Sequence, residues 1–284
     1  MPRRHPDWIK VRAPGSPNYL RLKRILREHK LHTVCEEARC PNIGECWDHR
    51  TATFLILGEI CTRGCRFCAI SKGKPALLDP EEPRNVGLVV KELGLQHIVV
   101  TSVNRDDLPD GGSAHFAETV SWIKRLNPGI RVEVLIPDFK GDRRALEDVV
   151  RSGIDILNHN METVPRLYKK VRPGAIYHRS LEILKSAKET RGEILTKSGL
   201  MLGVGETIEE VMATLKDLRQ INCDIVTLGQ YLRPSEDQLA VERYVTPEEF
   251  QGLRREAEKL GFRHVESGPL VRSSYHAWSH VPAC

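Results

Sequence analysis

Short apolar runs alternate with amphipathic stretches along most of this chain, starting near residue 51. The apolar runs cover residues 53–57, 96–103, 131–136, 154–157, 194–202 and 224–228. Between them, apolar residues recur at the three- and four-residue spacing of a helix, at 83–93, 115–126, 143–152, 177–190 and 208–220. We therefore predict six strands that alternate with helices.

Alternating strands and helices require parallel strands joined by right-handed crossovers. The periodicity fits both a doubly wound open sheet and a partial (β/α)6 barrel of the TIM type, and the cysteine placement described below favours the barrel. A polar, helix-permissive stretch at 16–29 and a Pro/Gly-bearing loop precede this unit. Thr246, Pro247 and two glutamates then start another helix, which runs to residue 260. We predict an N-terminal extension (1–50), the barrel (51–245) and a C-terminal extension (246–284).

Composition narrows the class of protein. With 284 residues, 40% of them hydrophobic and 29% charged, the chain can bury a full core without disulfides. Its longest apolar runs are strand-sized, far below the roughly 18 residues of a membrane span, so we expect no membrane association. The net charge is +5 with interspersed signs, which does not imply nucleic acid. The basic start lacks the apolar core of a secretory signal, so we expect a cytoplasmic protein.

Six of the eight cysteines cluster between residues 35 and 68. In a reducing compartment such a cluster binds metal more readily than it forms disulfides. The cysteines form two triplets, C-x4-C-x5-C and C-x3-C-x2-C, and not the C-x2-C pairs typical of zinc. Three thiolates on a four-iron cluster leave one iron open for a substrate or cofactor, so iron–sulfur chemistry is favoured over zinc and over coincidence. Cys223 and Cys284 stand alone, as a buried small residue and an exposed tail thiol.

The second triplet, Cys61, Cys65 and Cys68, directly follows a predicted strand and has Phe67 before its last cysteine. It resembles the signature of radical S-adenosylmethionine (SAM) enzymes. That resemblance implies a [4Fe–4S] cluster whose open iron is chelated by SAM, on the catalytic face of a barrel. It also places Phe67 near the adenine of SAM, although an apolar plug over the cluster explains this side chain equally well.

The first triplet, Cys35, Cys40 and Cys46, lies in CEEARCPNIGECW. Together with TSVNRDDL, NHNMET, KKVRP and a C-terminal RSSYH, it resembles the lipoyl synthase family of radical SAM enzymes. The resemblance implies a second, auxiliary [4Fe–4S] cluster with a serine oxygen as its fourth ligand. We assign that ligand to Ser274 in preference to Ser273. An oxygen ligand is a poorer match than thiolate for iron in a sulfide cluster, which suits a cluster that is dismantled in use.

Five further polar residues are candidates for binding SAM or the substrate. Asn104 follows the second predicted strand, where the family usually has aspartate, and Asn160 ends the fourth. Glu133 lies inside a strand, and a carboxylate that points into a barrel needs a partner, which SAM could supply. Arg172 and Lys197 are cations that we place near SAM or the peptide carboxyls. The acidic residues around Asp106 are equally consistent with a solvated turn.

By resemblance, the reaction starts from reduction of the Cys61/Cys65/Cys68 cluster and cleavage of SAM to a 5′-deoxyadenosyl radical. The radical acts at C6 and C8 of an octanoyl group on a carrier-protein lysine, and the auxiliary cluster donates sulfur. Implied partners are an octanoylated lipoyl domain of a 2-oxoacid dehydrogenase or the glycine cleavage H protein, a ferredoxin or flavodoxin, and an iron–sulfur carrier. The alternatives are another sulfur-inserting radical SAM enzyme or an iron–sulfur scaffold or electron-transfer protein.

Overall fold

An eight-stranded sheet forms the centre of the protein, for which we use a computed structural model that describes residues 5–49 and 51–277. The strands are ordered β1-β2-β5-β6-β7-β8-β9-β10, and every pairing is parallel except that of β1 with β2. Their bounds are β1 His32–Thr33, β2 Thr53–Ile56, β5 His97–Ser102, β6 Arg131–Leu135, β7 Ile156–Asn158, β8 Leu195–Leu202, β9 Ile225–Gln230 and β10 His264–Gly268. The six predicted strands are confirmed, and β10 adds a seventh parallel strand that the sequence analysis missed.

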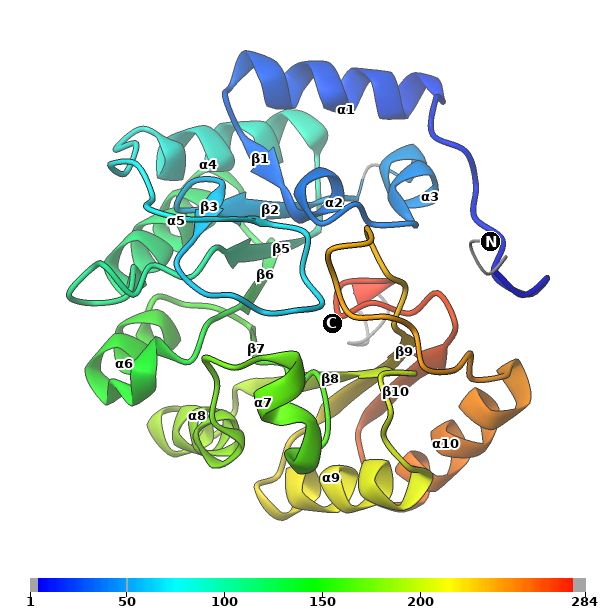
Figure 1. Cartoon of the computed structure of the whole chain (residues 1–284). Helices are drawn as coiled ribbons and strands as arrows, with labels where there is room; N and C mark the ends of the chain where they lie inside the picture. Colours follow the sequence, from blue (N-terminus) through cyan, green and yellow to red (C-terminus); the bar gives the residue numbers. More distant parts are fainter. Residues whose placement is uncertain (1–4, 50, 278–284) are drawn as a thin grey trace.

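Helices cover the outer face of this curved sheet (Figure 1). They are α4 Glu82–Leu93, α5 Ser113–Leu126, α6 Arg143–Arg151, α7 Tyr168–Val171, α8 Tyr177–Thr190, α9 Ile208–Gln220 and α10 Pro247–Lys259, with short 3-10 turns at Phe139–Gly141 and Pro165–Leu167. Thr207 and Thr246 begin α9 and α10 with complete capping boxes, each closed by the glutamate three residues on. The result is a partial barrel, because β1 and β10 each have one neighbour and the sheet stays open.

The N-terminal segment lies across the open side of the barrel (Figure 1). It contains α1 Pro17–Glu28, α2 Val34–Glu37 and α3 Ile43–Asp48, while the small parallel pair β3 Ile60–Cys61 and β4 Ser71–Lys72 lies just beyond β2. The predicted loop around the first cysteine triplet is therefore wrong in part, since Cys35 belongs to α2 and Cys46 to α3. These helices are too short for apolar periodicity to reveal them.

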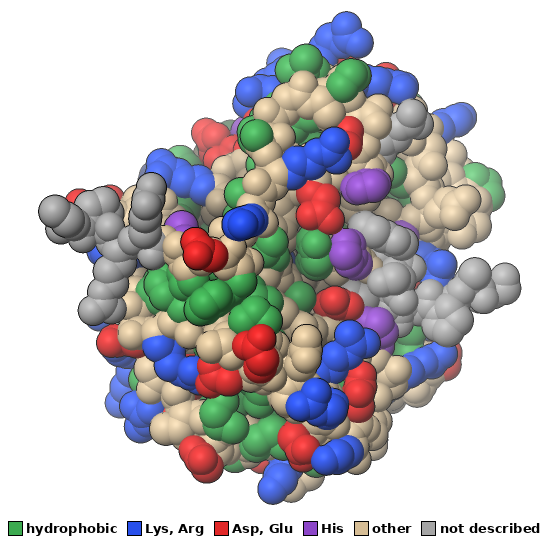
Figure 2. Space-filling model, turned by 90° about the vertical axis from the view of Figure 1, so that its right-hand side faces the viewer, with side chains coloured by type: hydrophobic (Ala, Val, Ile, Leu, Met, Phe, Trp, Pro, Cys, Tyr) green, Lys and Arg blue, Asp and Glu red, His purple; other side chains and the backbone are tan. Residues whose placement is uncertain are grey.

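The face shown in Figure 2 carries basic and acidic side chains interspersed with hydrophobic ones, and no broad field of one charge. This distribution agrees with the small net charge of +5. Within residues 5–49 and 51–277, no helix combines the length and apolarity needed to cross a membrane.

Candidate active site

The radical triplet lies in the loop that follows β2. Cys61 ends β3, and Cys65 and Cys68 lie in the turn before β4. The backbone N–H groups of Arg63 and Asn104 each donate to the Cys61 sulfur at 3.4 Å. Such donors stabilise negative charge on sulfur, which the ligand to a cluster carries.

Arg63 anchors this loop to the barrel. Its guanidinium forms two hydrogen bonds with Asp106, at 2.7 and 2.9 Å, and lies 2.6 Å from the fully buried Asp138. Burial raises the pKa of Asp138, but Arg63 outweighs burial and lowers it. Asp106 lies in a partly exposed turn, as one of the two interpretations had it, but its carboxylate is held by Arg63. Arg63 lies within the radical triplet motif, and the sequence analysis did not single it out.

The auxiliary triplet approaches the same space from the N-terminal segment. Cys35 and Cys46 lie on α2 and α3, with Cys40 in the turn between them. All seven cysteines of the described part are free thiols, and Cys223 is buried as expected, whereas Cys284 lies outside the described residues. The two triplets are thus available as ligands, and Cys223 lies apart from both, at the amino-terminal ends of β8 and β9, where its thiol contacts the carbonyls of Thr196 and Ile225.

A segment that follows β10 completes the auxiliary side. Residues 269–275, which we call the strap, pass so close to Gly229 on β9 that a Cβ there would collide with the Val271 carbonyl. Asn42 donates to the carbonyl of Leu270 at 2.7 Å, and the hydroxyl of Tyr275 donates to the carboxylate of Glu45 at 3.1 Å. The strap is therefore fixed by two residues that lie between Cys40 and Cys46 in the sequence.

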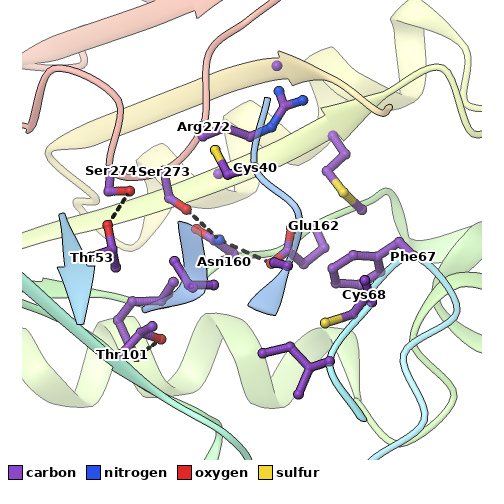
Figure 3. A pocket seen from close by; sticks show the side chains of 18 of the residues that line it. Cys40, Thr53, Phe67, Cys68, Thr101, Asn160, Glu162, Arg272, Ser273 and Ser274 are labelled. Atoms are coloured by element: carbon purple, nitrogen blue, oxygen red, sulfur yellow. Dashed lines mark hydrogen bonds between the residues drawn. The ribbon is translucent and has the colours of Figure 1, made fainter. Parts of the chain in front are cut away.

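Both triplets and the strap line one cavity of about 510 Å³ at the carboxyl ends of the strands. This volume lies within the range of small-molecule sites. Figure 3 shows Cys40 and Arg272 at one end and Cys68 and Phe67 at the other, with Asn160 and Glu162 between them. Eleven predicted residues line it: Cys35, Cys40, Cys46, Cys61, Cys65, Cys68, Phe67, Asn104, Asn160, Arg172 and Ser274.

Burial disfavours the thiolate form of five cavity cysteines in the metal-free chain. It raises the pKa of Cys35 and of Cys68 to about 12, and it also raises the pKa of Cys40, Cys46 and Cys65. Thiolate ligands must be deprotonated, so metal binding to either triplet must release protons. Three thiols brought together in each triplet suit a metal cluster, whose cations compensate the charge of the thiolates.

Unpartnered polar atoms mark where a cofactor fits. The side-chain oxygens of Asn104 and Asn160 and the Nε of Arg172 are buried without a hydrogen-bond partner within the described protein. Buried polar groups are normally paired, so these three atoms call for a polar ligand in the cavity. A carboxamide oxygen such as that of Asn104 can accept a hydrogen bond from an ammonium group.

Glu133 and Lys197, which we expected near SAM or the substrate, are not among the residues that line the cavity. Both side chains point into the barrel, but they lie one layer deeper than the cavity lining, two residues before Leu135 on β6 and Gly199 on β8. Lys197 Nζ donates to Glu133 Oε1 at 2.8 Å, so the partner of this carboxylate is a lysine of the same chain. The structure does not bring this pair to the cavity.

Glu162 and Arg272 line the cavity but were not singled out in the sequence. Burial raises the pKa of Glu162, against the effect of Arg172. Asn160 Nδ2 donates to Glu162 at 3.0 Å and to the Ser273 hydroxyl at 3.2 Å. Glu162 adopts a positive φ of 64°, which is uncommon for a non-glycine residue and turns its side chain into the site. Both residues lie in motifs quoted above, Glu162 in NHNMET and Arg272 in RSSYH, and their charge inside these motifs is the signal that could have identified them.

Comparison with known proteins gives the class first. Residues 55–218 match the model of the radical SAM superfamily, so the chain is a radical SAM enzyme, a class that uses a [4Fe–4S] cluster and SAM. Solved structures share its fold at low identity: methylornithine synthase (TM-score 0.51, 18% identical, 75% of this chain and 70% of that one) and SuiB of Streptococcus suis bound to SAM (TM-score 0.57, 12% identical, 87% and 53%).

The particular family follows from closer relatives. Residues 2–40 match the N-terminal domain of lipoyl synthase. The lipoyl synthase of Roseiflexus sp. is 57% identical over 99% of this chain and 93% of its own length, and that of Caldanaerobacter subterraneus is 58% identical over 96% of each. The chain belongs to the lipoyl synthase family. The scaffold and electron-transfer alternatives are thereby set aside.

Proposed function

We propose that this enzyme inserts two sulfur atoms, at C6 and C8 of an octanoyl group linked to a carrier-protein lysine, with an auxiliary [4Fe–4S] cluster as the sulfur source. The supporting observation is that both cysteine triplets and Ser274 line a single cavity. A carbon chain placed there is within reach of both metal sites. A protein that only stored clusters would not need a shared cavity between them.

Cys61, Cys65 and Cys68 would hold the radical cluster, and Cys35, Cys40, Cys46 and Ser274 the auxiliary one. When bound, the radical cluster and SAM supply the radical that attacks an unactivated methylene, which no protein acid or base can do. The protein orients the reactants and excludes water. Apolar side chains of the cavity lining suit an alkyl chain: Leu55, Leu135, Ile136, Leu200 and Met201.

The SAM site is proposed at the radical end. Phe67 offers a ring for the adenine, and the unpartnered oxygen of Asn104 can accept from the ammonium of the methionine moiety. Arg172 lines the cavity and is fixed by the carbonyl of Asn160, to which it donates at 2.6 Å, while its Nε has no partner within the described residues. The orphaned Asn160 oxygen is then available to a ribose hydroxyl or to the substrate amide.

The partners follow from this chemistry. We propose an octanoylated lipoyl domain or glycine cleavage H protein as the substrate, a ferredoxin or flavodoxin as the reductant, and an iron–sulfur carrier that rebuilds the auxiliary cluster. Free thiols and thiolate-held clusters suit a reducing compartment such as the cytoplasm. In this proposal residues 1–50 hold the auxiliary cysteines, 51–245 form the radical SAM barrel, and 246–284 deliver Ser274.

The test is an anaerobic single-turnover reaction of the cluster-reconstituted protein with SAM, dithionite and an octanoyl-lysine peptide, followed by mass spectrometry. We expect a peptide in which two hydrogens are replaced by two sulfurs in the reduced lipoyl form. Cys46→Ala should cleave SAM without sulfur insertion, while Cys223→Ala, a buried cysteine outside the cavity, should do both. Sulfur insertion by Cys46→Ala at the normal rate would refute the auxiliary cluster as donor.

A further inference from the structure

Thr53, the first residue of β2, contacts two of the four proposed auxiliary ligands. Its hydroxyl donates to the Ser274 hydroxyl oxygen at 2.7 Å, and its backbone N–H acts on the Cys35 thiol, whose pKa it lowers against the larger effect of burial. The residue is 4% exposed and lines the cavity. β2 pairs with β5 through Thr53 and Val99, so the position of this hydroxyl is set by the sheet.

The strap separates the two neighbouring serines. Asn160 donates to Ser273, whereas Thr53 donates to Ser274, as the dashed lines in Figure 3 show. Ser273 therefore faces the centre of the cavity and helps to hold Asn160. Ser274 faces the side on which Cys35 lies. The contacts of the strap with Asn42 and Glu45 restrict both serines to these directions.

The chemistry of a serine ligand explains why a donor is needed at this point. A serine that binds iron loses its proton, and its oxygen then only accepts hydrogen bonds. A hydrogen bond to an ionised acceptor is about twice as strong as one to a neutral acceptor. A donor already directed at the oxygen therefore favours the iron-bound serine over the protonated, detached one.

We propose that Thr53 is a positioning residue that holds Ser274 as the fourth ligand of the auxiliary cluster through a hydrogen bond from its hydroxyl. This inference rests on the proposed function, because it takes Ser274 as a ligand. It adds the residue that controls how firmly the oxygen-bound iron is retained. Thr53 acts through Ser274 and touches neither SAM nor the octanoyl chain.

The experiment measures iron retention directly. Wild type, Thr53→Val, Thr53→Ser, Ser274→Ala and the Thr53→Val/Ser274→Ala double variant are reconstituted with ⁵⁷Fe and mixed with an iron chelator. SAM is kept bound so that the open iron of the radical cluster is covered. Mössbauer spectroscopy follows the iron held by oxygen, and chelator absorbance follows its loss. Valine keeps the shape and backbone N–H of threonine, and Ser273→Ala is the matched control on the strap.

We expect Thr53→Val to lose one iron roughly tenfold faster than wild type, with retention restored by Thr53→Ser and unchanged in Ser273→Ala. The double variant should lose iron no faster than Ser274→Ala. Wild-type retention in Thr53→Val, or added loss in the double variant, overturns the role of Thr53 and leaves the proposed function intact. Wild-type retention in Ser274→Ala overturns the serine ligand itself, and the inference with it.

Discussion

Lys197 Nζ and Glu133 Oε1 are 2.8 Å apart inside the barrel, and both side chains are fully buried. Burial alone would raise the pKa of Glu133, but Lys197 and then His97 outweigh it and lower the pKa to about 2. The carboxylate is therefore ionised at neutral pH. Asn158 on β7 adds a hydrogen bond at 3.0 Å, so the pair ties three strands together beneath the cavity.

Removing one partner should cost much more than removing both. Lys197→Met leaves a buried carboxylate without its cation, and we expect the free energy of unfolding to fall by about 3–5 kcal/mol. The Glu133→Gln/Lys197→Met double variant should recover most of this loss. Urea unfolding followed by circular dichroism measures both. SAM affinity of the double variant should match wild type, and a large loss of affinity would return this pair to the SAM site.

A side chain at Gly229 should displace the strap. A Cβ in Gly229→Ala meets the Val271 carbonyl, so Ser274 moves away from the auxiliary cysteines. We expect iron content to fall toward that of one cluster and sulfur insertion to drop roughly a hundredfold. SAM cleavage should persist. Gly252→Ala, in an open position on α10, is the control and should be neutral or slightly stabilising. Full auxiliary iron in Gly229→Ala would contradict the placement of the strap.

Arg63→Lys should impair SAM cleavage and spare the auxiliary iron, the opposite of the effect expected for Gly229→Ala. Lysine keeps the positive charge but cannot pair with Asp106 through two parallel hydrogen bonds while also reaching Asp138. We expect SAM cleavage to fall roughly tenfold with the auxiliary iron retained. Arg166→Lys alters a similar bidentate pair, with Glu210, on the surface, and should leave cleavage unchanged. Equal effects of the two substitutions would show that the Arg63 loop is not specially constrained.

His159 should make the protein less stable in mild acid. Burial lowers its pKa to about 4, with Arg172 as the next cause. As pH falls below about 6.5, the unfolded chain takes up a proton that the folded chain refuses, so stability is lost between about pH 6.5 and 4.

Thermal unfolding across this range should show the loss in wild type and a smaller one in His159→Gln. Glu162 titrates in the opposite sense because burial raises its pKa, so the test is the difference between the two proteins. Parallel pH profiles would contradict the assignment to His159.

The two cysteine triplets of the candidate site could be singled out from the sequence because their information is local. Cys61, Cys65 and Cys68 are close in sequence, and so are Cys35, Cys40 and Cys46, so spacing alone indicates the chemistry. The depth of Glu133 and Lys197 could not be predicted, because it depends on how far each residue lies from the carboxyl end of its strand, and strand ends are the least certain part of a periodicity.

Two other features, β10 and the contact made by Thr53, were not predicted from the sequence, for different reasons. β10 carries Glu266, Ser267 and Gly268 in its second half, so it lacks the continuous apolar run of an inner parallel strand. Thr53 looks like an ordinary strand residue, and its proposed role arises from contact with a residue 221 positions later. Contacts at that separation cannot be read from one sequence.

The strap also sets an order of events during synthesis. A ribosome releases all six cysteines of the two triplets early, yet the serine that faces Thr53 follows it by 221 residues, after every strand of the barrel. A nascent chain can therefore present both triplets long before the oxygen ligand arrives. In the proposed enzyme, maturation of the auxiliary cluster is thus coupled to completion of the barrel, and a chain stalled before β10 would have only three of the four proposed ligands for that cluster.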